Sequence, residues 1–545
     1  MAACAAALID RVTPSKKHLK PEEYFGSKDG QTAIIGNGVL LEEKALTEDG
    51  LLYLPYEYVH TELAPSIFYD REEEKLILTG PASKEILELT DGRTNGGEAL
   101  SREDGLYISS GLLEQYASLK LTEFEEPQRL CIWSQSSLVM DKTGKKSVIR
   151  KNAGIKSPIV KDLEESEILI LQDMNADGST KEGKTEGWTR VATEDGFSGY
   201  IKDGDLAGSI FEEDVSLSQG QGEYTRCRID GKLNMVFHQT TDQASNDALT
   251  EAVGGMSGVN AIAPTWFFLD DTDGAVHSLA SPSYVETAHA MGLKVYAVLN
   301  DFDGGLHSAA ETAEALGNDT KRSAIVASVM EGLRDSGADG LNIDIELVKE
   351  ETADSYLELL REFSAELRKE GKSLLIDTFV PKFTMYLNRT EQARVADYVV
   401  LMCYDEHSAS SAEAGSVSSA SFLEEGVRKA LEEVPADQLV AALPFYTRLW
   451  ETAENGEVSS QAYGMSSAAQ AVSSLEMTPE WDEKCGQNYG EKQSGDTLYQ
   501  IWLEDGDSLA RKMEILRQYD IAGIAEWKLG FETEDIWEVL KEGLS

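Results

Sequence analysis

The chain has 545 residues, of which 97 are Asp or Glu and 49 are Lys or Arg, so its formal net charge is -48. Such an acidic chain repels phosphate backbones, which argues against a nucleic-acid-binding protein. The length exceeds what one hydrophobic core supports, and a hydrophobic content of 41% is ample for packed domains. We therefore expect a multidomain globular protein.

The five cysteines are widely scattered, and no CxxC pair or His cluster accompanies them. The sequence therefore predicts neither a disulfide framework nor a metal site. No GxGxxG motif follows the first strand of the C-terminal half, so no dinucleotide cofactor is expected. Nowhere do about 18 consecutive apolar residues occur, so no complete transmembrane helix is predicted.

Residues 1–29 contain a short run of small apolar residues, but no basic stretch precedes it. Because a complete signal peptide has both features, we interpret the segment as the remnant of a signal or anchor sequence followed by a linker. An ordinary chain terminus is the alternative. The first interpretation predicts an extracellular or cell-envelope-associated protein.

Residues 30–132 contain an imperfect repeat, with copies that begin at Glu48 and Arg102. Each copy runs through an acidic turn with glycine, a short Leu-Tyr strand, a helix-like segment, an aromatic strand, a charged turn and an apolar strand. This order predicts two small α+β units in one module. The module resembles the repeated domain at the N-terminus of copper amine oxidases and in Gram-positive surface proteins, which implies a spacer or a wall contact.

Residues 133–210 hold several short apolar runs and close with GWTRVATEDGFSGYIKDGDL, which predicts a small antiparallel barrel. The ending resembles bacterial Src-homology-3-like domains, which implies binding to a cell-wall polymer. From Asp141 to Asp162 there are seven basic residues and two acidic ones. This island could contact an anionic wall polymer, or it could be an ordinary solvated face. A linker is expected at 211–230.

From residue 231 to 545, apolar runs alternate with amphipathic helical segments. The eight apolar runs are 233–239, 260–269, 293–300, 339–348, 373–380, 397–405, 439–450 and 521–530. Gly292, Gly337 and Gly371 end three helical segments, as expected for C-terminal caps. Eight strands with crossover helices predict a (β/α)8 TIM barrel as the catalytic domain, preceded by the small all-β barrel and the α+β repeat module.

The seventh connection, residues 451–504, is far longer than the ~2 to 6 residues usual in such barrels. Its stretch NYGEKQSGDTLYQIWLED predicts a hairpin with a Gly-containing turn. We expect this insertion to form one side of a substrate-binding cleft.

The fourth predicted strand, ADGLNIDIELV, alternates strictly between apolar and polar residues. Asn342, Asp344 and Glu346 share one face, which points into the barrel if the apolar face packs against helices. Unpaired carboxylates in an interior cost on the order of several kcal/mol, a cost tolerated mainly where acids do chemistry. Asp344 and Glu346 are therefore the candidate catalytic pair.

Active sites in this barrel class lie at the carboxyl ends of the strands. Besides the acid pair, the chemically distinctive residues there are Tyr404, Asp405, Tyr446, Arg448 and Trp527. Carboxylates for proton transfer and aromatic faces for pyranose rings, without a set of metal ligands, indicate a sugar site. Glu346 lies nearer the open end of its strand and is the natural acid for a glycosidic oxygen.

Alternate residues of one strand stand roughly 6.6 Å apart, so Asp344 and Glu346 are close enough for one to hold a proton at neutral pH. Both acids then lie on one side of the sugar. A retaining enzyme with its own nucleophile instead needs a second carboxylate about 5 Å away across the scissile bond. Two alternatives follow: a base elsewhere activates water, or the substrate supplies the nucleophile.

Four motifs resemble glycoside hydrolase family 18, the chitinase-like enzymes. DGLNIDIE is similar to the family's DGxDxDxE, and MCYD, from Met402 to Asp405, is similar to its MxYD. LPFYTR is similar to GxPxYGR, and EWKLG supplies the tryptophan expected on strand eight. The resemblance covers about residues 231–545.

The resemblance implies a substrate-assisted mechanism, which family 18 uses in place of a second carboxylate. Glu346 then protonates the leaving oxygen, and Asp344 orients the acetamido group that attacks the anomeric carbon. The resemblance implies substrate contacts at Asn342, Met402, Tyr404, Asp405, Tyr446, Arg448 and Trp527. Asp339 would support the turn that enters the strand.

Some of these assignments have structural alternatives. Tyr446 and Trp527 could be rim packing, and Arg448 could anchor a salt bridge. Asn342 stands where the family pattern has an aspartate, and an amide cannot share a proton with Asp344. We therefore expect Asp344 to have one fewer anionic neighbour and to ionise more readily.

Within family 18, MCYDEH and the stretch from Ile501 to Gly530 resemble the spore-cortex and cell-wall branch. That branch implies an N-acetylglucosaminidase that cleaves peptidoglycan. We expect the protein to be a monomer and to need no cofactor. Chitin or chitooligosaccharide is the second substrate. A non-catalytic glycan-binding barrel is the alternative from another class, and the presence of Glu346 argues against it.

Overall fold

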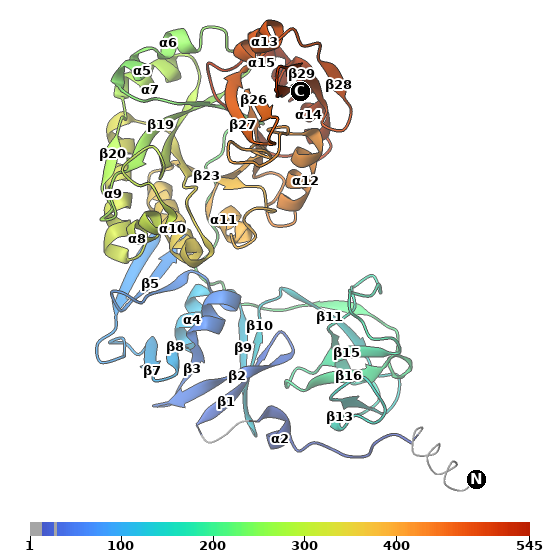
Figure 1. Ribbon diagram of the computed structural model, residues 1–545. Coiled ribbons are helices and arrows are strands. Elements are labelled where there is room, and N and C mark those ends of the chain that lie inside the picture. Colours follow the sequence, from blue (N-terminus) through green and yellow to red (C-terminus); the bar gives the residue numbers. More distant parts are fainter. Residues whose placement is uncertain (1–12, 27–29, 545) are drawn as a thin grey trace, which may run out of the picture. The chain divides into compact units, whose positions relative to one another are not determined.

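The computed structural model describes residues 13–26 and 30–544 (Figure 1). Residues 1–12 and 27–29 of the predicted signal or anchor remnant thus lie outside the described residues. The chain divides into two compact units. The N-terminal unit comprises Met1–Tyr69, Glu74–Gly80 and Glu85–Gly222, and the barrel unit comprises Asp70–Glu73, Pro81–Lys84 and Glu223–Ser545. Within the described ranges, no helix has the length and apolarity needed to span a membrane.

One sheet of the N-terminal unit has the strand order β7-β8-β3-β2-β1-β10-β9. Its strands are β1 (Gln31–Gly36), β2 (Val39–Glu48), β3 (Leu51–Pro55), β7 (Ala99–Arg102), β8 (Gly105–Ser109), β9 (Lys120–Glu125) and β10 (Gln128–Trp133). A smaller sheet contains β4 (Ile67–Asp70), β5 (Lys75–Gly80) and β6 (Ser83–Glu88). Helix α2 (Pro21–Phe25) lies in the stretch expected to be linker, yet Phe25 is buried.

The two repeat copies share one order of elements. The first runs through β3, the helical turns α3 (Tyr56–Tyr58) and η1 (Val59–Leu63), β4 and β5. The second runs through β8, α4 (Ser110–Tyr116), β9 and β10. The copies meet where β3 pairs antiparallel with β8, and Leu54 lies opposite Ile108, both fully buried. The Leu-Tyr strand of each copy thus supplies the core of the module.

The second sheet of the N-terminal unit is antiparallel, in the order β13-β12-β16-β15-β14-β11-β17. Its strands are β11 (Ser137–Lys142), β12 (Ser147–Arg150), β13 (Ile159–Leu163), β14 (Ile168–Leu171), β15 (Trp188–Ala192), β16 (Ser198–Lys202) and β17 (Phe211–Asp214). A core of its own includes the buried Ile149, Leu169, Val191 and Ile201. Because β17 pairs with β11, the sheet continues past the expected limit at residue 210.

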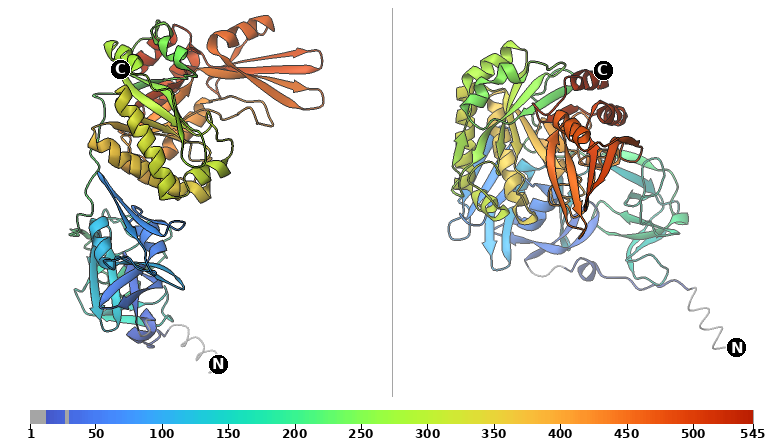
Figure 2. Two further views of the ribbon diagram at one scale, coloured as in Figure 1. Left: turned by 90° about the vertical axis from the view of Figure 1, so that its left-hand side faces the viewer. Right: turned by 45° about the horizontal axis from the view of Figure 1, so that its top comes forward.

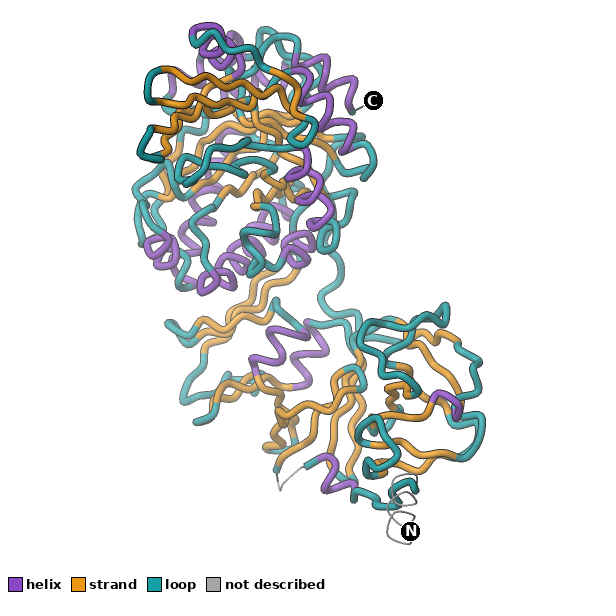
Figure 3. The backbone as a smooth tube through the Cα atoms, turned by 45° about the vertical axis from the view of Figure 1, so that its right-hand side comes forward, coloured by secondary structure: helices purple, strands orange, loops and turns teal. Residues whose placement is uncertain are grey.

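Eight parallel strands of the barrel unit close into a barrel, with β18 paired to both β31 and β19 (Figure 3). They are β18 (Leu233–His238), β19 (Ala261–Leu269), β21 (Lys294–Asn300), β22 (Gly340–Asp344), β23 (Ser373–Phe379), β24 (Tyr398–Met402), β25 (Leu439–Pro444) and β31 (Gly523–Trp527). The short β20 (Val276–Ser278) adds antiparallel to β19. The predicted (β/α)8 barrel is confirmed.

Helices surround these strands (Figures 1 and 3). They are α5 (Gln243–Asp247), α6 (Leu249–Ala252), α7 (Pro282–Ala290), α8 (Ala309–Ala315), α9 (Asp319–Ser336), α10 (Ala353–Lys369), α11 (Arg389–Val395), α12 (Ala420–Ala430), α14 (Gly506–Leu516) and α15 (Ile536–Gly543). Gly292, Gly337 and Gly371 follow α7, α9 and α10 with φ values of 81°, 80° and 65°. This left-handed conformation favours glycine and ends each helix as predicted.

Strand β22 divides its side chains between two cores. Leu341 and Ile343 pack in the outer layer between strands and helices, whereas the inner core is lined by residues such as Val298 and Leu375 of the adjacent strands. Asn342 and Asp344 alternate with the outer residues and therefore point inward. The strand ends at Asp344, so the predicted range to 348 is too long, and Glu346 lies in the loop that follows.

The insertion after β25 is an antiparallel sheet in the order β27-β26-β30-β29-β28. It contains β26 (Tyr446–Ala453), β27 (Val458–Gly464), α13 (Met465–Ser474), β28 (Glu480–Asp482), β29 (Gln487–Ser494) and β30 (Thr497–Leu503). Figure 2 shows its long strands extending away from the barrel. The predicted hairpin is β29–β30, but the predicted seventh strand, 439–450, is in fact two strands, β25 and β26.

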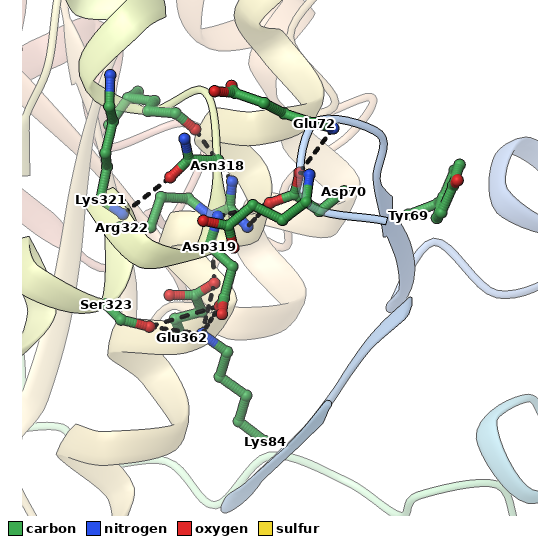
Figure 4. A network of polar contacts seen from close by, with 12 residues as sticks. Tyr69, Asp70, Glu72, Lys84, Asn318, Asp319, Lys321, Arg322, Ser323 and Glu362 are labelled. Carbon is green, nitrogen blue, oxygen red and sulfur yellow. Dashed lines mark hydrogen bonds and ion pairs between the residues drawn. The ribbon is translucent and has the colours of Figure 1, made fainter. Parts of the chain in front are cut away.

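A cluster of buried charges lies elsewhere in the barrel unit (Figure 4). Arg322 of α9 donates from Nε to Glu362 of α10 at 3.2 Å, and neither side chain is more than 2% exposed. Lys84 Nζ pairs with Glu362 at 3.1 Å and also with Asp319. These buried carboxylates are thus matched with cations, as burial normally demands.

Candidate active site

The polar residues of β22 and of the loop that follows it form the centre of the candidate site. Asn342 is fully buried and Asp344 is 5% exposed, both on β22. Glu346, two residues past the strand end, is half-buried at the mouth of the barrel. The alternation that the sequence displays therefore brings one amide and two carboxyl groups to the carboxyl end of the barrel, as predicted for a site in this fold.

Asp301, directly after β21, fixes the loop that carries Glu346. Its Oδ1 accepts a hydrogen bond from the backbone N–H of Glu346 at 2.9 Å, and its Oδ2 accepts one from Leu347 N–H at 3.1 Å. The Thr312 hydroxyl also donates to Oδ2, at 2.8 Å. The sequence prediction missed Asp301, although an acid directly after a barrel strand is a signal that could have found it.

Glu346 has the electrostatics of a proton donor. Burial raises the pKa of its carboxyl to about 7, and the nearby negative charges of Asp301, Asp405 and Asp303 act in the same direction. A carboxylic acid with such a pKa holds its proton near neutral pH and can release it during a reaction.

Asp344 also favours its protonated form. Burial is the main cause that raises its pKa well above the ordinary value, followed by the charges of Glu346 and Asp377. The expectation that Asn342 makes Asp344 ionise more readily than an aspartate at that position would make it stays a prediction. An acidic neighbour is supplied by Asp377 of the adjacent strand β23, and Asn342 Nδ2 donates to Asp377 Oδ2 at 2.6 Å.

An aromatic wall stands beside the acids. The Tyr446 hydroxyl donates to Asp405 Oδ1 at 2.6 Å, and the Tyr446 and Tyr404 rings meet edge to face with centroids 6.2 Å apart. Burial raises the pKa of Tyr404 well above its ordinary value, and Asp344 and Asp377 add to the effect. Tyr404 therefore lies near the acid pair as a neutral hydrogen-bond donor. Met402, at the end of β24, is 5% exposed beneath it.

The remaining predicted residues make contacts with other parts of the barrel unit. Trp527, at the end of β31, meets the Phe237 ring at 5.5 Å between centroids. Arg448 belongs to β26 of the insertion and donates to Ser460 Oγ at 3.0 Å. Asp339 lies at the opposite end of β22, where it accepts hydrogen bonds from His289 and Lys294 at 2.7 Å each.

The site combines a neutral acid at its rim, a second neutral acid beneath it, and tyrosine hydroxyls and a tryptophan around them. This set can protonate a leaving oxygen and hold a polar ring substituent near Asp344. Across residues 13–26 and 30–544, no group of three His, Cys, Asp or Glu side chains is arranged to hold a metal ion.

Comparison with known proteins agrees with this chemistry. Residues 297–532 match the model of "Glycosyl hydrolases family 18". Most of the barrel unit is thus similar to this family. The match includes every predicted site residue, and it confirms the enzyme class expected from the sequence, a glycosidase.

The chain is also similar to two proteins of Bacillus subtilis strain 168. The uncharacterized glycosylase YvbX is 23% identical over 337 residues, 59% of this chain and 94% of its own length. The cortical fragment-lytic enzyme is 23% identical over 241 residues, 42% of this chain. The match spans only 54% of that relative's own length.

Among solved structures, a chitinase from Chromobacterium violaceum superimposes with a TM-score of 0.52 at 19% identity. The match covers 58% of this chain and 99% of the chitinase. At this level of identity the likeness supports the barrel fold.

Proposed function

We propose that the chain hydrolyses β-1,4 bonds next to N-acetylglucosamine in peptidoglycan, with retention of configuration and with the substrate's acetamido group as nucleophile. The observation that carries the proposal is Glu346, a rim carboxyl group whose pKa is raised to about 7 by burial and by neighbouring acids. Such a group delivers a proton to a glycosidic oxygen at neutral pH.

Among the described residues near Glu346, Asp344, Asp301 and Asp405 are poorly suited to act as an enzyme nucleophile. Nucleophilic attack requires an ionised carboxylate, and Asp344 keeps its proton because burial raises its pKa well above the ordinary value. Asp301 is occupied by two backbone N–H groups and Thr312, and Asp405 accepts the Tyr446 hydroxyl. The acetamido carbonyl of the substrate then attacks the anomeric carbon as Glu346 protonates the leaving oxygen.

The other roles follow from position. Asp344 orients the acetamido N–H and stabilises the positive charge that develops on the group, while the Tyr404 hydroxyl donates to the acetamido oxygen. Asp405, held by Tyr446, binds a sugar hydroxyl, and Trp527 lies under the reacting ring. Asn342 and Met402 form the floor, and Arg448 contacts the sugar chain from the insertion. Glu346, now ionised, activates the water that opens the cyclic intermediate.

Two observations favour peptidoglycan. One relative is named a cortical fragment-lytic enzyme. The two sheets of the N-terminal unit also agree with the wall-associated modules that the sequence resembles, an amine-oxidase-like repeat and a Src-homology-3-like barrel. The basic island between Asp141 and Asp162 would contact an anionic wall polymer, at the cell envelope or outside the cell.

Digestion of purified peptidoglycan, followed by mass spectrometry of the muropeptides, tests the proposal. We expect new N-acetylglucosamine reducing ends from the wild type and none from Glu346→Gln, which keeps the shape but cannot donate the proton. Chitooligosaccharides are digested in parallel, and cleavage of them alone would favour the chitinase alternative. Absence of products from both substrates would refute the glycosidase proposal.

A further inference from the structure

Asp377 is a buried acid that no motif singled out. It lies on β23, next to the catalytic strand β22, and is 5% exposed. The strands pair in parallel with Ile343 opposite Ile376, so the next pair along is Asp344 and Asp377. Neighbouring strands stand about 4.8 Å apart, and both side chains point into the barrel. The two carboxyl groups are therefore lateral neighbours.

The carboxyl oxygen atoms of Asp344 and Asp377 differ in their hydrogen bonds. Asp377 Oδ2 accepts the 2.6 Å hydrogen bond from Asn342. Asp377 Oδ1 and Asp344 Oδ1 are both buried, and neither finds a hydrogen-bond partner within the described ranges. Two buried carboxylates at this distance cannot both be ionised, but a single shared proton satisfies one oxygen of each.

We propose that Asp377 is a positioning residue of the reaction, which shares one proton with Asp344 and is itself held in place by Asn342. The inference rests on the proposed function. When the acetamido group becomes positively charged, the O–H bond at Asp344 breaks and one at Asp377 forms. Asp344 becomes the anion next to the new charge, while the pair keeps a total charge of -1.

The groups around Asp344 and Asp377 favour a state in which the two carboxyl groups carry a single proton between them. The proposed transfer requires that state. The titratable groups that face it are Glu346 from the same chain segment, Asp301 and Asp303 after β21, Tyr356 of α10, and Tyr404 after β24. All of these groups are acids or phenols, so none of them supplies a positive charge that would stabilise both carboxyl groups in their ionised forms. Burial raises the pKa of Asp377 well above its ordinary value, as it does for Asp344.

The pairing makes Asp377→Asn informative, since the substitution preserves shape and removes the proton acceptor. We expect kcat on a fluorogenic N-acetylglucosamine oligosaccharide to fall by at least about tenfold, with little change in KM. The acidic limb of the pH–rate profile should move up by about one pH unit, because Asp344 must now ionise alone in a buried site. Thr378→Val on the same strand, facing the helices, is the matched control and should change neither quantity.

A rescue variant separates positioning from simple structural support. In Asn342→Asp combined with Asp377→Asn, the second acid moves to the same strand as Asp344, so kcat and the acidic limb should return most of the way to wild type. An unchanged kcat and profile in Asp377→Asn would overturn the proposal. So would a double variant that folds like the wild type but is as impaired as the single one.

A direct titration needs neither variant folding nor a known substrate. In carbon-13 NMR of the wild-type chain labelled at aspartate carboxyl groups, Asp344 and Asp377 should move through the same two steps, as coupled acids do. Independent single-step titrations would overturn the shared proton. If the wild type cleaves no glycan, the proposed function fails, and this titration still decides the pairing.

Discussion

The carboxyl groups at the two ends of strand β22 have opposite electrostatic environments. Asp339, at the amino end, accepts hydrogen bonds from Lys294, His289 and the Val295 backbone. Burial opposes its ionisation, but these hydrogen bonds and the Lys294 charge hold the pKa below its ordinary value. At the carboxyl end, Asp344 has acids as neighbours, and burial and those acids raise its pKa.

This difference in environment indicates a separate role for the carboxyl groups at each end of the strand. An acid that only stabilises a fold is matched with hydrogen-bond donors and cations, as Asp339 is with His289 and Lys294. An acid kept protonated by other acids costs stability and gains the ability to give up a proton. The groups at the carboxyl end of β22 are therefore suited to proton transfer, and those at the amino end to support of the fold.

The largest expected effect is that of Glu346→Gln. The amide retains the shape of the side chain but has no acidic proton, so kcat should fall by about 10²- to 10⁴-fold. Hydrolysis of a fluorogenic N-acetylglucosamine oligosaccharide measures the loss, and the thermal midpoint checks the fold. A variant with near wild-type kcat would remove Glu346 from the mechanism.

Asp301→Asn should have the next largest effect, because it disturbs the loop that positions Glu346. The new amide can accept only one of the two backbone N–H groups and turns its own NH2 toward the other. We expect kcat to fall about tenfold, with a smaller change in KM. Thr312→Val removes only the hydroxyl donor and serves as the matched control; equal rates in wild type and Asp301→Asn would contradict the positioning role.

Asp339→Asn should show the reverse pattern at the other end of the strand. It weakens hydrogen bonds from Lys294 and His289, so we expect a loss of about 1–3 kcal/mol in the free energy of unfolding at pH 7 and an unchanged kcat. Since its pKa is lowered by folding, the contribution is present above the ordinary value of about 3.9 and disappears at lower pH. Urea unfolding at pH 7 and pH 3 checks both statements, and a lower kcat would show that the two ends are not independent.

The smallest effect is on stability as a function of pH. The folded-state pKa of Glu346 is raised to about 7, so its contribution to stability is fully present below the ordinary value and is lost as the pH rises through about 7. Between pH 5 and pH 8 the thermal midpoint of wild type should fall by ~1–3 °C more than that of Glu346→Gln. Parallel thermal curves for the two proteins would mean that Glu346 is not protonated at pH 5 to 7.

Much of this could be predicted from the sequence because the signals are local. All eight barrel strands follow from apolar runs, and the polar row on β22 follows from alternation within five residues. The hairpin β29–β30 follows from its Gly-containing turn. Such features depend on residues close together in the chain.

The features that the sequence prediction missed depend on contacts between segments. Asp377 matters because strand register places it beside Asp344, and Asp301 matters because it reaches the backbone of a loop 45 residues later. The end of the seventh strand was also misplaced, since apolar residues continue from β25 into the first half of β26 and only Phe445 lies between the two strands. The sequence shows Asp301 only as an acid directly after a strand. Its role, like that of Asp377, comes from its position in three dimensions.

The central claim is that the acids at the carboxyl end of β22 act on a nucleophile belonging to the substrate. Aryl N-acetylglucosaminides whose acetyl group carries zero, one, two or three fluorine atoms test it most directly, because fluorine withdraws electrons from the attacking carbonyl oxygen with little change in size. If the account is right, kcat/KM falls steeply with each added fluorine. A value that stays constant across the series would show that the acetamido group is not the nucleophile, and would contradict the account.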